Sequence, residues 1–169
     1  MQAIFIRHGS AEPAGAGADA DRKLTEEGFG QVRATAEALK ALGVKLEVIL
    51  TSPLVRAAQT AGAVAELHGG AAIEAAEFLA PPCNAKALRQ RLAELAAAGI
   101  STVGLVGHTP SLGACIGQLV TGSRQAGLSL SKAGAACVEI PPAESSDPPE
   151  LLWLMRREQL AALARAGRD

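Results

Sequence analysis

The chain has 169 residues, of which 49% are hydrophobic and 20% charged, and its formal net charge is -1. These values are typical of a soluble globular protein and predict a single domain over residues 1–169. The near-zero net charge excludes a broad basic field for nucleic acid or an anionic membrane, so any anion binding has to be local. Aromatic residues make up only 2%, so Ala, Leu, Val and Ile must build the core.

The cysteines and the N-terminal residues indicate a cellular compartment. Cys83, Cys115 and Cys137 are odd in number and widely spaced, and they form no C-x-x-C pair. This pattern argues against a disulfide framework or a zinc site, and it predicts buried free thiols in a reducing compartment. Arg7 and His8 interrupt the first apolar stretch too early for a signal peptide, and no apolar run approaches the ~18 residues of a membrane span. We therefore expect a cytoplasmic protein.

Strands and helices are expected to alternate from the start of the chain. Residues 3–6 form an apolar run typical of a buried strand, and the Gly-, Ala- and Asp-rich segment 10–22 is expected to be a loop. Thr25 is the expected N-cap of a helix with acidic residues in its first turn, and Gly43 ends that helix.

The same alternation continues to the end of the chain. After a strand at 46–50, Ser52 is expected to be an N-cap and Pro53 the first residue of the next helix. The remaining strands are expected at 72–78, 102–106, 134–140 and 151–155, and the remaining helices at 85–98, at 111–120 and from 156 to a frayed end. This order predicts a three-layer α/β/α sandwich with a mostly parallel central sheet.

Reactive side chains follow three of these strands. Arg7 and His8 come directly after the first strand, Arg56 lies one turn into the helix after the second, and His108 follows the strand at 102–106. Because the carboxyl ends of parallel strands share one edge of a sheet, we expect these four side chains to meet in one pocket.

The ordinary structural explanation of these residues is weighed beside the functional one. A lone histidine at a strand end is more often a hydrogen-bonded structural residue than a catalyst. Arg56 has no evident stabilising purpose, because a cation in the first turn of a helix opposes the helix dipole. The occurrence of all four residues in matched positions therefore favours a functional site.

Such a pocket suits the binding and transfer of a phosphoryl group. Two guanidiniums present forked donors to phosphate oxygens, and the helix N-termini after Ser52 and Thr109 add backbone N–H groups. An imidazole with a free lone pair can attack phosphorus. No cluster of Asp and Glu is placed to hold a metal, since Asp19 and Asp21 lie in the loop, so charge neutralisation falls to Arg and His.

At this point the sequence resembles the histidine phosphatase superfamily, also called the phosphoglycerate mutase-like or RHG family. The likeness covers nearly the whole chain and keeps the family's order and spacing. The matching blocks are Ile6-Arg7-His8-Gly9, Leu24-Thr25-Glu26-Glu27-Gly28, Ser52-Pro53-Leu54-Val55-Arg56-Ala57-Ala58-Gln59-Thr60-Ala61 and Gly107-His108-Thr109-Pro110. Small size, the turn at 132–134 and the late Leu151-Leu152-Trp153 resemble the phosphohistidine phosphatase (SixA) subgroup, and the long insertion of phosphoglycerate mutases is missing.

The resemblance implies a phosphoglycerate mutase-like fold and a role for each reactive residue. His8 would be the nucleophile that becomes phosphorylated, while Arg7, Arg56 and His108 would bind the phosphoryl oxygens. The implied route has two steps, uses no metal or other cofactor, and ends when water hydrolyses the phosphohistidine. His8 has to be neutral to attack, and the neighbouring cations favour that state.

Many relatives use a carboxylic acid to protonate the leaving oxygen, and this sequence offers one positional candidate for it. Glu77 is the positional candidate, although a solvated glutamate at a strand end explains it equally well. Glu12 is a second nearby carboxylate in the loop, with no readable role. A phosphohistidine substrate tolerates the lack of a strong acid, because imidazole leaves more easily than an alkoxide.

The leading hypothesis is therefore a phosphatase acting on phosphohistidine in a signalling or phosphorelay protein. A phosphatase of small phosphomonoesters is the alternative, and the short interval 79–107, which leaves little material for a lid, favours the protein substrate. A non-catalytic phosphate-binding module is a third hypothesis, but it predicts the loss of at least one of the four core residues. The expected partner is a phosphorylated histidine-containing protein or a small phosphate compound, without nucleic acid or membrane, and the oligomeric state stays open.

Overall fold

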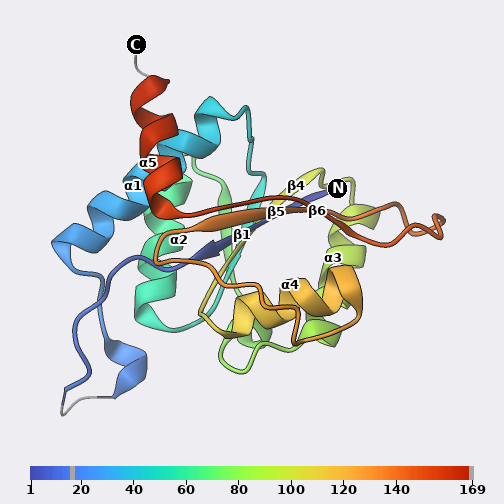
Figure 1. The fold of residues 1–169 in the computed structure, drawn as a ribbon, viewed down its shortest axis with the longest axis horizontal. Coiled ribbons are helices and arrows are strands. Elements are labelled where there is room, and N and C mark those ends of the chain that lie inside the picture. Colours follow the sequence, from blue (N-terminus) through green and yellow to red (C-terminus); the bar gives the residue numbers. More distant parts are fainter. Residues whose placement is uncertain (16–17, 168–169) are drawn as a thin grey trace.

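A six-stranded sheet lies between two layers of helices (Figure 1). The computed structural model describes residues 1–15 and 18–167. The strands are β1 (Gln2–Arg7), β2 (Val48–Thr51), β3 (Ala72–Ala75), β4 (Thr102–Gly107), β5 (Ala135–Glu139) and β6 (Glu150–Met155). The helices are α1 (Glu26–Ala41), α2 (Val55–Leu67), α3 (Ala85–Ala97), α4 (Ser111–Thr121) and α5 (Arg157–Ala166), with short 3-10 turns η1 (Asp19–Asp21) and η2 (Glu77–Leu79).

The strand order β3-β2-β4-β1-β5-β6 places β1 and β4 side by side at the centre of the sheet. The pairs β1–β4, β2–β4 and β2–β3 are parallel, whereas β5 runs antiparallel to both of its neighbours. Register pairs Arg7 with Gly107 and Thr51 with Val106, so β1, β2 and β4 end at the same edge. The predicted mostly parallel α/β/α sandwich is confirmed.

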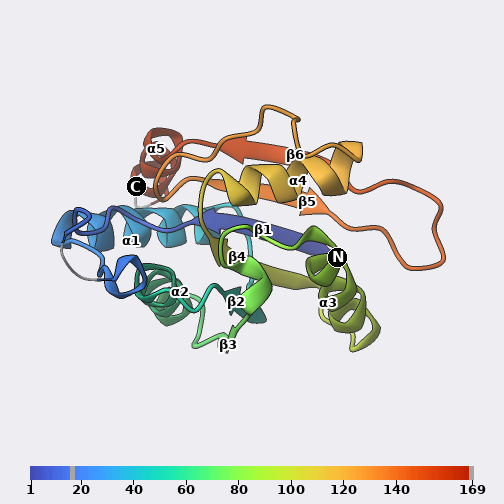
Figure 2. The same cartoon turned by 90° about the horizontal axis from the view of Figure 1, so that it is seen from below.

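Both faces of the sheet are covered, as the turned view shows (Figure 2). Helices α1, α2 and α5 cover one face and α3 and α4 the other. Along β1, Phe5 packs into the α3–α4 core, while Ile4 and Ile6 pack into the opposite core, and all three are fully buried. Burial of each such side chain stabilises the fold by roughly 1.5–3 kcal/mol, which fixes the direction in which β1 delivers the residues that follow it.

The two predicted helix caps have different outcomes. Thr25 is the N-cap of α1, and its hydroxyl accepts a hydrogen bond from the Gly28 N–H. The assignment of Ser52 as N-cap and Pro53 as first helical residue is wrong, because α2 begins at Val55 with Leu54 as its N-cap. The fully buried Ser52 hydroxyl instead contacts His108.

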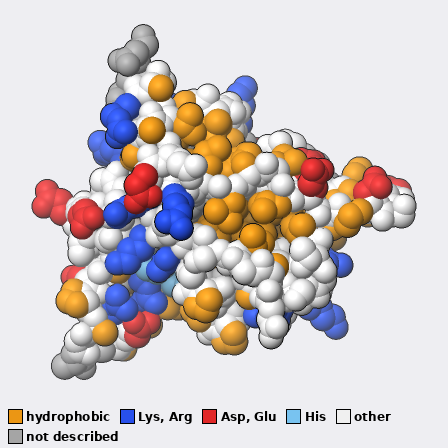
Figure 3. All heavy atoms as spheres, viewed as in Figure 1, with side chains coloured by type: hydrophobic (Ala, Val, Ile, Leu, Met, Phe, Trp, Pro, Cys, Tyr) orange, Lys and Arg blue, Asp and Glu red, His pale blue; other side chains and the backbone are white. Residues whose placement is uncertain are grey.

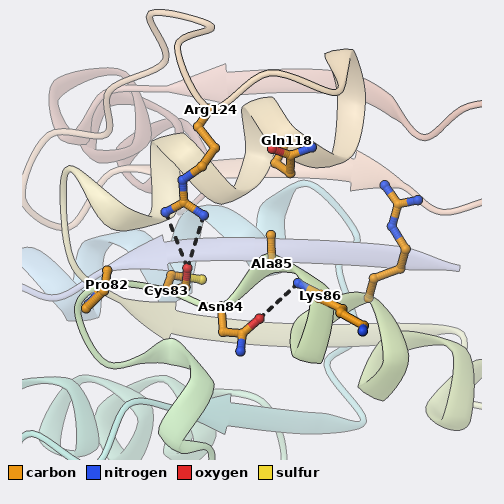
Figure 4. A pocket seen from close by; sticks show the side chains of 8 residues that line it. Pro82, Cys83, Asn84, Ala85, Lys86, Gln118 and Arg124 are labelled. Atoms are coloured by element: carbon orange, nitrogen blue, oxygen red, sulfur yellow. Dashed lines mark hydrogen bonds between the residues drawn. The ribbon is translucent and has the colours of Figure 1, made fainter.

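The prediction of free thiols is wrong for two of the three cysteines. Cys83 and Cys115 form a disulfide that joins the segment before α3 to α4, while Cys137 is free and buried. Their 32-residue separation along the chain gives no sign of this proximity, but the packing of α3 beside α4 brings the two Cα atoms to 6.5 Å, within disulfide range. The carbonyl of Cys83 also accepts hydrogen bonds from Arg124 at the wall of a cavity of about 730 Å³ (Figure 4).

Two further sequence expectations concern the ends of the described ranges. Within the segment 10–22, expected to be a loop, residues 19–21 form η1, and residues 16 and 17 lie outside the described ranges. The frayed end expected beyond α5 falls on residues 168 and 169, which also lie outside them. Over the part of the chain that the structure describes, no helix is long and apolar enough to cross a membrane.

Candidate active site

His8 and His108 meet at the carboxyl edge of the sheet. His8 follows β1 and His108 follows β4, and the centres of their rings lie 5.1 Å apart. Both imidazoles are buried, as is the Arg56 side chain from the first turn of α2. On the surface, Figure 3 shows histidine among a group of Lys and Arg side chains on one face of the molecule. The edge of the sheet thus brings together the residues that the three strand ends predicted.

The ring of His8 has one nitrogen occupied and one open. Its Nδ1 lies 2.7 Å from the carbonyl oxygen of Gly9, and because a carbonyl only accepts, Nδ1 carries the hydrogen. Nε2 therefore keeps its lone pair. Burial lowers the pKa of His8 to about 4, with help from the charges of Arg56 and Arg7 and against the effect of the Gly9 hydrogen bond. Above that pH the imidazole is a neutral nucleophile.

Close packing of β1 against α1 explains why glycine follows His8. A Cβ atom on Gly9 would lie 2.6 Å from the carbonyl oxygen of Gly28, which is closer than real contacts allow. The Gly9 N–H also donates to the Thr60 hydroxyl in α2, one turn after Arg56. The Arg-His-Gly triplet is therefore held between two helices, which restricts the movement of the His8 backbone.

His108 is oriented by a serine. Its Nε2 lies 2.8 Å from the Ser52 hydroxyl oxygen, while its Nδ1 is buried and has no hydrogen-bond partner among the described residues. Burial, followed by the charges of His8 and Arg56, lowers the pKa of His108 to about 3. A neutral imidazole with Nδ1 protonated offers one unused donor to a phosphoryl oxygen. Sequence reasoning missed the contact of Ser52 with His108, because the helical pattern after Ser52 favoured the interpretation of Ser52 as a helix cap.

Arg7 is anchored at one end of its guanidinium. Nη1 donates to the carbonyl of Leu130 at 2.8 Å, and Nε is buried without a partner among the described residues. The backbone nearby is also fixed, since the Ala133 N–H donates to the His8 carbonyl and Ala133 adopts a left-handed φ of 53°. Burial lowers the pKa of Arg7, but a guanidinium remains charged at any physiological pH.

Arg56 has a carboxylate partner that sequence reasoning did not assign. Its Nη1 donates to the Asp19 carbonyl at 2.6 Å and its Nη2 to Asp19 Oδ2 at 2.9 Å. Arg22 Nη1 donates to the other carboxylate oxygen at 2.7 Å. A loop without periodicity gives no sign that its aspartate turns back onto α2, so only the fold shows this contact.

The two glutamates considered as acids are placed differently. Glu77 lies exposed in η2, which follows β3 at the same end of the sheet, and no hydrogen bond or ion pair among the described residues joins it to His8, Arg7, Arg56 or His108. The Glu12 carboxylate accepts a hydrogen bond from the Lys23 N–H at the surface. The role of Glu77 as proton donor stays a prediction.

No metal site accompanies these residues in the described ranges. Among residues 1–15 and 18–167, no three His, Cys, Asp or Glu side chains gather in a way that would hold an ion.

The fold and the edge cluster together define a phosphatase of the mixed α/β class. Residues 3–80 match the sequence model of the histidine phosphatase superfamily, branch 1. Phosphohistidine phosphatase SixA of Escherichia coli is 32% identical over 123 residues, covering 72% of this chain and 76% of that protein. The chain belongs to the histidine phosphatase superfamily, and within it to the SixA group.

Further proteins are similar to this chain in sequence or in structure. An uncharacterised protein of Picosynechococcus sp. is 38% identical over 135 residues, which cover 79% of this chain and 82% of that protein. The structure of the protein histidine phosphatase SixA complexed with tungstate superposes with a TM-score of 0.85 at 27% identity, covering 95% of this chain and 99% of that one. A phosphoserine phosphatase of Entamoeba histolytica shares the fold alone, with a TM-score of 0.68 at 18% identity over 90% of this chain and 95% of that one.

Proposed function

We propose that the protein removes phosphoryl groups from histidine side chains of signalling or phosphorelay proteins through a covalent phosphohistidine on His8. The observation that carries this proposal is the state of the His8 ring. Its Nδ1 is occupied by the Gly9 carbonyl, and its Nε2 is neutral, unprotonated and exposed to the positive charges of Arg7 and Arg56. A positioned neutral imidazole of this kind is an effective nucleophile toward phosphorus.

The proposed reaction has two displacements. In the first, the Nε2 lone pair of His8 forms a bond to phosphorus, and the bond to the leaving group breaks with its electron pair on that group. In the second, a water oxygen attacks phosphorus, the P–N bond breaks, His8 regains its lone pair, and a proton from water passes to solvent. In both, Arg7, Arg56 and the Nδ1–H of His108 stabilise the charge on the phosphoryl oxygens.

A phosphohistidine substrate fits the site better than an ester because imidazole is the easier leaving group. Glu77, the candidate proton donor for an ester, is exposed, and among the described residues it makes no hydrogen bond or ion pair with the cluster. The similarity to E. coli SixA supports the same choice. The short connection between η2 and β4, most of which is α3, favours an open site that admits a protein side chain. A small-molecule phosphatase remains the alternative, and a non-catalytic module is disfavoured since all four residues are present.

Comparison of two substrate classes tests the proposal. We expect turnover of a phosphorylated histidine-containing domain to exceed that of sugar phosphates in kcat/KM, and we expect the H8A variant to turn over neither. A rapid acid-free quench should trap a base-stable, acid-labile phosphoprotein. Sugar phosphate turnover that equals or exceeds that of the phosphodomain would favour the alternative, and retained activity in H8A would contradict the nucleophile assignment.

A further inference from the structure

Asp19 reaches a buried cation of the site from the outside. Its side chain is 61% exposed, whereas that of Arg56 is only 7% exposed. Arg56 donates one hydrogen bond to the Asp19 backbone carbonyl and one to its carboxylate. The Asp19 charge also acts on His108. The carboxylate therefore lies at the mouth of the site, on the solvent side of the phosphate-binding arginine.

Two arginines hold this carboxylate in place. Oδ1 accepts from Arg22 and Oδ2 from Arg56, and Arg22 is itself fixed by a 2.6 Å hydrogen bond from its Nε to the Glu12 carbonyl. A carboxylate has about four lone-pair positions, so an exposed one with two bonds can accept further hydrogen bonds. The hydrogen bonds from Arg22 and Arg56 lower the pKa of Asp19. Asp19 is consequently an anion at neutral pH and has no proton to give to a leaving group.

We infer that Asp19 is a specificity-determining residue that selects the protonated imidazole of phosphohistidine over the oxygen of a phosphate ester as leaving group. This inference rests on the proposed function, and it supports the same substrate class from Asp19 instead of His8. A fixed negative charge at the mouth attracts a leaving group that carries a positive charge, and it repels one on which negative charge develops.

The chemistry of the step agrees with this choice. A phosphohistidine ring protonated at its second nitrogen donates that N–H to Asp19. His8 Nε2 bonds to phosphorus, the P–N bond to the substrate breaks, and its electron pair neutralises the ring, which departs as imidazole with the N–H still in place. An ester, by contrast, releases an alkoxide or phenoxide beside an anion that cannot protonate it.

The experiment compares wild type, D19N and D21N on two probes, a phosphohistidine peptide and p-nitrophenyl phosphate. Asp21 lies in the same turn, is exposed, and its side chain makes no hydrogen bond or ion pair among the described residues, so D21N is a matched control. We expect D19N to lower the ratio of kcat/KM for the peptide to that for the ester about tenfold or more, as is typical for loss of a charged hydrogen bond. D21N should leave the ratio within about twofold.

Other outcomes overturn the inference. A parallel fall on both probes in D19N would mean that Asp19 only positions Arg56, and a parallel rise would mean that it merely occupies the phosphate site of the free enzyme. Thermal unfolding of D19N checks that the variant is folded. If the wild type turns over neither probe, the proposed function fails together with this inference, whereas wild-type activity on the peptide with an unchanged ratio in D19N removes the inference alone.

Discussion

At the scale of single residues, burial of His8 and His108 couples stability to pH. Their folded-state pKa values, about 4 and about 3, lie below the ordinary 6.5 of histidine, so the unfolded chain binds protons that the folded protein does not. Above about pH 6.5 the two histidines therefore do not reduce the free energy of unfolding, and they reduce it increasingly as the pH drops toward 4. Urea unfolding at a series of pH values should show this slope, and H108N should flatten it. An unchanged slope in H108N would contradict the lowered pKa of His108 in the folded protein.

Ser52 determines which ring nitrogen of His108 carries the hydrogen. Among the described residues the Ser52 hydroxyl has no other acceptor for its hydrogen, so it donates to His108 Nε2, and the Leu54 N–H reaches its oxygen at 3.4 Å. We expect S52A to shift His108 from the Nδ1–H toward the Nε2–H tautomer and to lower kcat/KM about tenfold, because the donor to phosphate is lost. Nitrogen-15 shifts of the ring report the tautomer directly.

A neighbouring hydroxyl supplies the control for this change. Thr51 is also buried, but among the described residues its hydroxyl donates only to the Ser52 carbonyl, so T51V should leave the His108 tautomer unchanged. Equal tautomer shifts in T51V and S52A would show that the effect is a general loosening of the strand end.

Sequence reasoning at this scale finds reactive side chains and misses their partners. His8 and His108 are visible because each follows an apolar run, which a strand explains. Ser52 and Asp19 are not, since their contacts join residues 56 and 37 positions apart, which no local pattern encodes. Ser52 sets the tautomer of His108 and Asp19 adds a negative charge beside Arg56. The chemistry of the site therefore depends on long-range contacts that cannot be predicted from local sequence patterns.

At the scale of elements, the approach of β1 to α1 depends on glycine. A Cβ atom on Gly28 would overlap the carbonyl of Ser10, a backbone atom that cannot rotate away, whereas Gly30 in the same helix is exposed and has open space around it. We expect G28A to destabilise the protein by about 1–3 kcal/mol and to reduce activity, because it displaces the segment after His8.

The matched variant G30A separates packing from helix propensity. With no obstacle near its Cβ, it should stabilise α1 by about 0.5–1 kcal/mol and leave activity unchanged. Urea unfolding and kcat/KM measured on both variants check the pair. Equal effects of the two substitutions on the free energy of unfolding would contradict the close-packing explanation.

The start of α2 shows why element boundaries are harder to predict than elements. Ser52 and Pro53 match the usual order of cap and first helical residue. In the structure, however, the chain bends at Pro53 and Leu54 before the helix begins at Val55. The fully buried Ser52 hydroxyl contacts a histidine that follows another strand. The Ser52 hydroxyl bonds to a residue after a neighbouring strand instead of capping its own helix. A local sequence pattern cannot distinguish these two outcomes.

At the scale of the whole molecule, the order in which apolar strand segments alternate with helical segments predicts the layered sheet. It does not predict which helices face each other. The packing of α3 beside α4 brings Cys83 and Cys115 together, and widely spaced cysteines favour free thiols until that packing is known. The wrong prediction thus comes from missing tertiary contacts and not from the chemistry of cysteine.

The disulfide between Cys83 and Cys115 is expected to stabilise the whole fold. A bridge that closes a loop of 32 residues restricts the unfolded chain and contributes about 3–4 kcal/mol in the chain-entropy model. Wild type in reductant and the C83A/C115A double variant should both unfold at lower urea concentration than the oxidised wild type. The double variant should not respond to reductant, while C137A, which removes only the free thiol, should respond as the wild type does. An oxidised wild type that is no more stable than its reduced form would show that the bridge adds nothing beyond the packing of α3 on α4.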